Sequence, residues 1–243
     1  MTASRVIAQA RATRAVAHRP WPLPDRPWLM GQTWEDLLFM HWRVPEAELR
    51  RVVPEQLPID AFDGGAWLGV TPFEVRALRL RRLPPLARFP ELNVRTYATV
   101  GGRAGIFFFS LDAARRDAVL GARLAYRLPY FHARMAIARE QGTIRYRSRR
   151  PGAEFAAAYE PCGAARAPAP GSLEHFLTER YCLYTVDRGR VLRADIHHAP
   201  WPLQPARADV AVNTMAPVAL RGEPLLHFAR RQDVVIWPLS AVR

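Results

Sequence analysis

Apolar and polar residues alternate over residues 91–100, the pattern of a β-strand that turns one face to a core. The apolar face would carry Leu92, Val94, Thr96, Ala98 and Val100. The other would carry Glu91, Asn93, Arg95, Tyr97 and Thr99. This strand therefore presents an acid, an amide, a guanidinium and a phenol side by side.

Turn signals divide the rest of the chain into short elements. Asp63-Gly64-Gly65 and Gly101-Gly102 are typical of tight hairpin turns. The pattern predicts strands over 37–43, 66–75, 105–112, 132–139, 143–149, 153–159, 183–187, 190–197, 225–229 and 233–237. It predicts helices over 45–49, 113–127 and 172–181, the last capped by Ser172, and proline-rich loops over 79–90 and 164–171. The expected fold class is α+β and mostly β.

Domain organisation follows from composition along the chain. Residues 1–26 are rich in arginine and proline, and we expect them to form a flexible tail. Residues 27–243 are expected to form a single β-rich domain, because 49% of the chain is apolar and its length suits one domain of this kind.

The chain of 243 residues contains 35 basic residues, all arginine, and 22 acidic ones, for a net charge of +13. The absence of lysine excludes a Schiff-base amine, a pyridoxal-phosphate anchor and a P-loop lysine. Cys162 and Cys182 form no C-x-x-C pair, which favours a reduced cytoplasmic protein. No apolar stretch is long enough to span a membrane, so we expect no membrane partner.

The high positive charge could indicate nucleic-acid binding, because arginine neutralises phosphates. It could equally reflect arginine used at ordinary solvated surface positions in place of lysine. We favour the second interpretation and do not expect a nucleic-acid partner. The sequence does not decide whether the chain forms a homo-oligomer.

Five blocks of the sequence resemble the uncharacterised YqjF-like proteins, a family of unknown function grouped with the acetoacetate decarboxylase-like fold. The resemblance spans residues 27–238, and the blocks are Trp34–Trp42, Pro90–Tyr97, Phe108–Asp112, Gly171–Tyr181 and His197–Trp201. It implies a closed or cone-shaped, mostly antiparallel β-barrel that encloses a ligand cavity, with a few flanking helices.

The decarboxylases of that fold use a Pro-Lys-Lys sequence after a helix, whose lysine forms the Schiff base. The comparable stretch here is Pro129-Tyr130-Phe131, so the resemblance carries over the fold and not imine chemistry. It also places Arg43 where those enzymes have an arginine in the pocket.

We therefore predict a site on the polar face of strand 91–100. Arg95 could hold a carboxylate, Asn93 and Tyr97 could donate or accept hydrogen bonds, and Glu91 could act as a base. The same side chains could instead face solvent, with Glu91 and Arg95 paired along the strand.

Further candidate ligand-binding residues are Tyr130, His132, Arg43, His41 and His197. His197 and His198 are neighbours on a predicted strand, so they point to opposite faces and only one can face the cavity. No set of residues has metal-ligand spacing, and we expect neither a metal nor a cofactor.

The leading hypothesis is a protein that binds a small anionic or carbonyl-bearing organic molecule in the barrel. One alternative is an enzyme in which Glu91 or a histidine acts as acid or base on a keto or enol substrate. The other is a nucleic-acid-associated basic protein.

Overall fold

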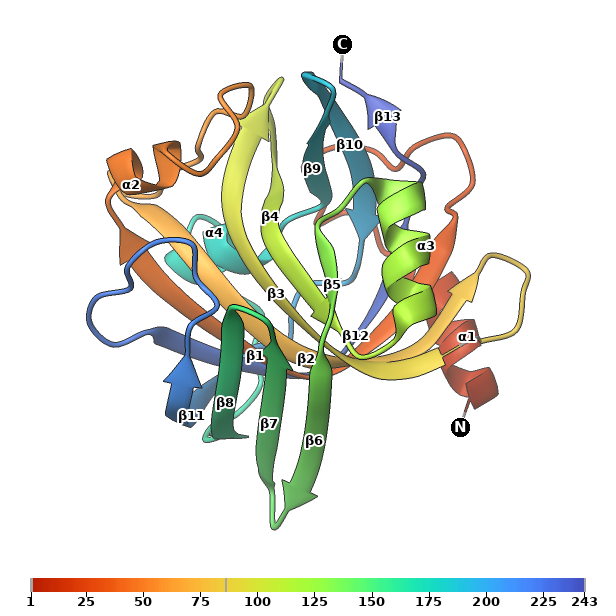
Figure 1. Cartoon of the computed structure of the whole chain (residues 1–243). Coiled ribbons are helices and arrows are strands. Elements are labelled where there is room, and N and C mark those ends of the chain that lie inside the picture. Colours follow the sequence, from red (N-terminus) through yellow and green to blue (C-terminus); the bar gives the residue numbers. More distant parts are fainter. Residues whose placement is uncertain (1, 86, 243) are drawn as a thin grey trace.

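Seven strands close into a ring in the computed structural model, which describes residues 2–85 and 87–242 (Figure 1). In order around the ring they are β10 (Arg190–His197), β9 (Cys182–Asp187), β4 (Arg103–Ala113), β3 (Ala87–Val100), β2 (Ala66–Leu80), β1 (Met30–Val44) and β12 (Leu225–Ile236). Two residue pairs between β10 and β12 close the ring, Ile196 with Ile236 and His197 with Val235. Neighbouring ring strands are antiparallel except β4 and β9.

A second sheet lies against the outside of the ring and occupies the lower part of Figure 1. Its strands, in order, are β11 (Gln204–Asn213), β8 (Ala153–Pro161), β7 (Thr143–Arg150) and β6 (Arg134–Glu140). β11 also pairs with β12, which joins this sheet to the ring. Two short strands, β5 (Tyr130–His132) and β13 (Ser240–Ala241), pair with β4 and β10. The expected α+β, mostly β class is confirmed.

The ring strands bury both of their faces, and this produces two apolar cores. On β1, Leu37 and Phe39 belong to an inner core enclosed by the ring. Leu38 and Met40 belong to an intersheet core between the ring and the second sheet. β3 alternates in the same way, as its sequence pattern predicts, but both faces of β1 and β3 are buried along their central residues, 37–42 and 91–98.

The helices α1 (Thr2–Ala12), α2 (Glu46–Arg50), α3 (Arg116–Tyr126) and α4 (Leu173–Thr178) flank the sheets. Ser172 caps α4 as predicted, since its hydroxyl oxygen accepts a hydrogen bond of 3.2 Å from the backbone N–H of His175. The helix ends three residues earlier than predicted, because Glu179 leaves the helical conformation. Within the described part of the chain, no helix combines the length and apolar character needed to cross a bilayer.

Other boundaries also differ from the sequence pattern. The region 79–90, expected to be a loop, contains the end of β2 and the start of β3, because Leu78 and Phe89 pack on the inner core. Strand β11 was not predicted, since its alternating residues are mostly small and it begins beside Pro205. The two hairpin turns are confirmed: Asp63 and Gly64 have φ of 49° and 66°, and Gly101 and Gly102 have 57° and 72°.

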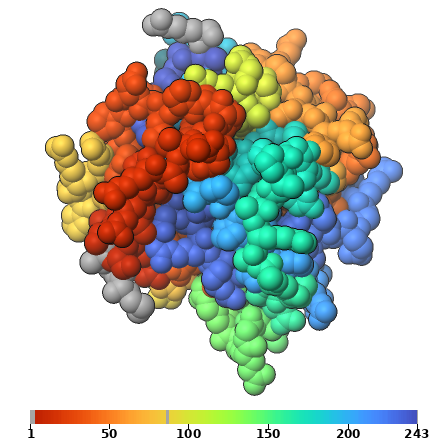
Figure 2. All heavy atoms as spheres, turned by 180° about the vertical axis from the view of Figure 1, so that it is seen from behind, coloured from red at the N-terminus to blue at the C-terminus, as the bar shows by residue number. Residues whose placement is uncertain are grey.

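The described residues 2–26 do not form the flexible tail that was expected for residues 1–26. Helix α1 packs on β1, β2 and β12, and its Gln9 is fully buried. Gln9 donates to the hydroxyl of Thr33 (3.2 Å) and accepts from Nε of Arg79 (2.7 Å). Farther along, buried Arg19 donates to the carbonyl of Ile196 (2.6 Å). Figure 2 shows this segment, in red, spread over one face of the molecule beside C-terminal residues.

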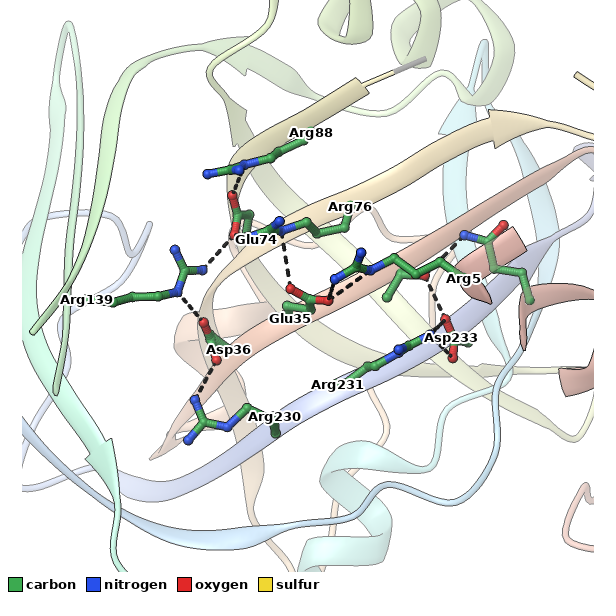
Figure 3. Close-up of polar contacts among 12 residues, drawn as sticks. Arg5, Glu35, Asp36, Glu74, Arg76, Arg88, Arg139, Arg230, Arg231 and Asp233 are labelled. Atoms are coloured by element: carbon green, nitrogen blue, oxygen red, sulfur yellow. Dashed lines mark hydrogen bonds and ion pairs between the residues drawn. The ribbon is translucent and has the colours of Figure 1, made fainter. Parts of the chain in front are cut away.

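A network of ion pairs ties the second sheet to the ring (Figure 3). Arg139 on β6 donates to Asp36 on β1 (2.7 Å) and to Glu74 on β2 (2.6 Å). Arg230 also pairs with Asp36 (2.9 Å). Burial raises the pKa of Glu74, but Arg139 and Arg76 outweigh burial and leave the pKa below its ordinary value. Several of the arginines thus serve internal pairs.

Candidate functional site

The ring encloses a cavity of about 60 Å³. All seven ring strands contribute to its wall, together with Tyr126 of α3 and Thr178 of α4. The cavity is thus large enough to admit a small molecule. The wall is mostly apolar, and its polar groups are therefore the candidates for fixing a ligand.

The polar face of β3 supplies three of these groups. Glu91, Asn93 and Arg95 all line the cavity and are 4%, 6% and 5% exposed. Their side chains point inward because the opposite face of β3 packs into the intersheet core. The structure thus selects the interior arrangement over the solvent-facing one.

Glu91 lies next to Tyr130, the residue that matches the decarboxylase lysine in the resemblance. The Tyr130 hydroxyl donates a hydrogen bond of 3.1 Å to Oε1 of Glu91. Burial raises the pKa of Glu91 to about 8, although this hydrogen bond opposes the shift. Burial also raises the pKa of Tyr130 well above its ordinary value. At neutral pH the cavity therefore holds a protonated carboxylic acid beside a phenol.

Arg95 brings a buried positive charge to the same wall. Its Nη2 donates weakly to the carbonyl of Leu177 (3.4 Å), and its Nε has no partner. No carboxylate of the described residues lies within 4.0 Å of this guanidinium, whereas Arg180, which also lines the cavity, pairs with Asp60 at 2.6 Å. A buried charge without an anion carries a desolvation cost, which an anionic ligand would offset.

Other polar atoms on the cavity wall also lack hydrogen-bond partners within the described structure. They are Oγ1 of Thr71, Oδ1 of Asn93, the hydroxyl of Tyr126 and Nε1 of Trp201. Buried polar atoms are nearly always paired in native proteins. Their gathering around one cavity indicates a site for an oxygen-bearing ligand.

Tyr97 and His41 lie behind this wall rather than on it. The Tyr97 hydroxyl donates to the carbonyl of Leu177 (2.8 Å), so it accepts from Nε2 of His41 (2.8 Å). Burial lowers the pKa of His41 well below its ordinary value, with a further contribution from Arg95. A neutral His41 and Tyr97 therefore support the segment against which Arg95 rests.

The structure separates the adjacent histidines as the alternation predicts. His198 lines the cavity, stacked on the ring of Tyr181 with centroids 4.7 Å apart. His197, expected to bind ligand, instead faces the N-terminal segment, where Nε2 donates to the carbonyl of Ala12 (2.8 Å) and Nδ1 accepts from Arg19 (3.1 Å). Burial lowers the pKa of His197 to about 4.

Two predicted site residues lie outside the cavity. Arg43 is exposed and donates to the carbonyl of Asp63 (3.0 Å), because β1 has passed the end of the cavity there and the side chain lies over Gly65. His132 is exposed in a surface hollow with Arg134, because it is the last residue of β5, two residues beyond Tyr130, which lines the cavity. The predictions that Arg43 and His132 bind the ligand are therefore not supported by their positions, because the face of a strand alone does not place a side chain in the cavity.

The sequence interpretation missed several residues that line the cavity: Thr71, Tyr126, Thr178, Arg180 and Trp201. Thr71 pairs in register with Asn93. The one signal for it in the sequence was a polar residue within an otherwise apolar strand. Trp201 is held by Glu179, whose carboxylate accepts from its backbone N–H (2.8 Å). No group of three metal-ligating side chains occurs among the residues that the structure describes.

A model of the DUF2071 family, described as an uncharacterized conserved protein, matches residues 31–233. The chain belongs to the DUF2071 family. It is 48% identical to the uncharacterized protein YqjF of Bacillus subtilis over 227 residues, 89% of this chain and 94% of YqjF. The resemblance to YqjF-like proteins is thereby confirmed.

Solved structures extend the likeness of this DUF2071 chain at the level of fold. An acetoacetate decarboxylase from Legionella pneumophila matches 93% of this chain and 93% of its own, with a TM-score of 0.64 and 10% identity. An acetoacetate decarboxylase-like enzyme from Sphingomonas wittichii RW1 matches 94% of this chain and 99% of its own, with a TM-score of 0.63 and 14% identity. The enduracididine biosynthesis enzyme MppR, solved with pyruvate, matches 93% of this chain and 94% of its own, with a TM-score of 0.63 and 12% identity. The acetoacetate decarboxylase-like fold is confirmed.

Proposed function

We propose that this protein binds a small organic acid that also carries a carbonyl group, such as a keto acid, in the cavity of the ring. The observation that carries the proposal is the buried Arg95 guanidinium, which faces the cavity without a carboxylate partner in the described structure. A carboxylate can accept two parallel hydrogen bonds from a guanidinium, which gives both affinity and orientation.

The remaining polar atoms suit the carbonyl end of the same ligand. Protonated Glu91 can donate a hydrogen bond to a carbonyl oxygen. The Tyr126 hydroxyl, which has no partner in the described structure, is a second donor on the wall. The cavity has room for a compact head group. MppR, which shares the fold, was solved with pyruvate, a molecule of this class.

Imine chemistry is not part of the proposal, because the chain contains no lysine. We also propose the small molecule rather than nucleic acid as the partner, since several arginines pair with carboxylates of the same chain. Retention on DNA that weakens steeply with salt would contradict this. Both free cysteines, Cys162 and Cys182, suit a reducing cytoplasm.

The test is calorimetric titration of the protein with pyruvate. We expect Arg95→Gln to weaken binding about 10- to 100-fold, because a hydrogen bond to a charged group contributes about 1.5–3 kcal/mol. Arg43→Gln is the matched control, since Arg43 is exposed and distant from the cavity wall. Equal affinity of the Arg95 variant and the wild type, or no binding by the wild type, overturns the proposal.

A second candidate function is acid-base catalysis by Glu91 on a bound keto acid. Its raised pKa, close to 8, is the observation that favours it. The carboxylate would take a proton from the carbon next to the carbonyl, leaving an enolate whose oxygen accepts hydrogen bonds from the wall. Such a base loses its activity when protonated, so the rate should rise with pH through about 8.

Deuterium exchange into pyruvate in heavy water, followed by NMR, measures this step. We expect the Glu91→Gln variant to bind pyruvate but to lose the catalysed exchange. Tyr130→Phe removes a hydrogen bond that lowers the pKa of Glu91, so the inflection of the rate should move to higher pH. Exchange that persists in the Glu91 variant excludes Glu91 as the base and leaves the binding proposal standing.

A further inference from the structure

A second hollow, of about 390 Å³, lies between α3 and the ends of β2 and β3 that run past the ring cavity. We call it the α3 hollow. Its apolar wall comes from Leu29, Leu78, Leu80, Phe89, Ala118, Gly121 and Ala125. In Figure 1, α3 is the green helix beside β5. The α3 hollow is several times larger than the inner cavity, yet nothing in the proposed function uses it.

The α3 hollow and the inner cavity adjoin each other. Six residues line both spaces: Met30, Gln32, Glu91, Ala122, Tyr126 and Tyr130. Among them, Glu91 and Tyr130 stand at the junction and are hydrogen-bonded to each other. A ligand whose carbonyl meets Glu91 therefore has the α3 hollow directly beside its next atoms.

Apart from the Tyr126 hydroxyl, which also lines the inner cavity, the polar side chains of the α3 hollow are engaged by the protein. Arg79 donates to Gln9 (2.7 Å), and the amide oxygen of Gln32 accepts from Trp34 (2.5 Å). Arg115 and Asp117, both exposed, form an ion pair with each other at the rim. A separate polar solute would find few partners here, whereas a hydrocarbon chain needs none.

The α3 hollow also reaches the surface on the side of α3. Leu80, which lines it, is 40% exposed, and Gly121 and Ala125 are exposed on the helix. Next to them, Leu120 and Leu124 are 60% and 63% exposed. The entrance thus has an apolar border, as suits a chain that enters from water along α3.

We propose that the α3 hollow binds the aliphatic tail of the ligand whose acid head occupies the inner cavity. The natural ligand is then a medium-chain keto acid rather than pyruvate itself. This inference rests on the proposed function and extends it from the head group to the class of the whole molecule.

Calorimetric titration with pyruvate, 2-oxohexanoate and 2-oxooctanoate tests the inference. Burial of one methylene group contributes enough to tighten binding about fourfold, so affinity should rise by roughly that factor for each methylene added. The rise should continue until the α3 hollow is filled.

Gly121→Phe is the variant that blocks the α3 hollow. A Cβ atom added at Gly121 has no neighbour within 4 Å, so a larger side chain can enter the hollow without a clash at its base. We expect this variant to bind pyruvate like the wild type and to lose the gain with chain length. Arg116→Phe is the control, because it places the same side chain at an exposed position of the same helix that lines neither the α3 hollow nor the inner cavity. Ala118→Leu fills the hollow from another position if Gly121→Phe does not fold.

The outcomes separate the two proposals. Affinity that does not change with the chain length of the acid overturns the tail site and leaves the proposed function intact. A gain with chain length that survives in Gly121→Phe and in Ala118→Leu does the same. If the two blocking variants, Gly121→Phe and Ala118→Leu, abolish the gain in affinity with chain length while Arg95→Gln has no effect, the tail site is supported and the head-group assignment is overturned. Failure of all three acids to bind overturns both.

Discussion

The inner core and the intersheet core share the same strands but treat polar groups differently. In the intersheet core, Tyr146 donates to the backbone carbonyl of Glu91 (2.7 Å), and Tyr159 donates to that of Asp36 (2.8 Å). In the inner core, the hydroxyl of Tyr126 and the Nε of Arg95 have no partner in the described structure. These two intersheet tyrosines find their acceptors within the chain, whereas the inner core keeps several polar atoms around one cavity that a ligand could satisfy. Buried polar atoms without partners therefore mark the candidate binding site in this fold.

The largest expected effect that separates the two cores is the pH dependence of stability from Glu91. Its pKa is about 8 in the folded chain and about 4.5 when unfolded, so the folded state binds the proton more tightly. Stability is therefore fully present below about pH 4.5 and is lost as the pH rises to about 8. The loss is on the order of 5 kcal/mol at most.

Urea unfolding at pH 5 and pH 8 measures this loss. Glu91→Gln cannot ionise and should remove most of the difference between the two pH values. If the variant shows the same loss as the wild type, Glu91 is not a buried neutral acid, and the inner core is electrostatically no different from the intersheet core.

A smaller effect is expected from removing one tyrosine hydroxyl in each core. Tyr146→Phe leaves buried carbonyls without their donor and should lower the free energy of unfolding by about 1–3 kcal/mol. Tyr126→Phe removes a hydroxyl that has no partner in the described structure, and should leave stability unchanged or raise it by up to about 1 kcal/mol. Thermal unfolding of the two variants without ligand compares them directly; equal losses would show that the two cores do not differ in this respect.

The sequence predicted the part of the site that depends on a single strand. Alternation along β3 placed Glu91, Asn93 and Arg95 on one face, and the burial of the opposite face turned them inward. The same alternation failed for Arg43, because the side of a strand does not reveal where along the strand the cavity ends. Strand position is a tertiary property, set by how far neighbouring strands extend.

The other misses have the same origin. Thr71, Tyr126 and Trp201 reach the cavity from segments far apart in sequence, so no local spacing connects them. The N-terminal segment looked mobile because it is rich in arginine, yet Arg19 is buried through contacts with β10 that only the closed ring provides. Composition describes what a segment contains and not what surrounds it.

The closure of the ring has a consequence for the order of folding. Its seam joins β10 to β12 through two residue pairs, and the N-terminal segment lies over that seam through Arg19 and the bond from His197 to Ala12. β1 also pairs with β12, which is nearly the whole chain away. During synthesis the ring cannot close until its last long strand has left the ribosome. Because contacts between distant segments form slowly, we expect closure of the cavity to be a late step of folding.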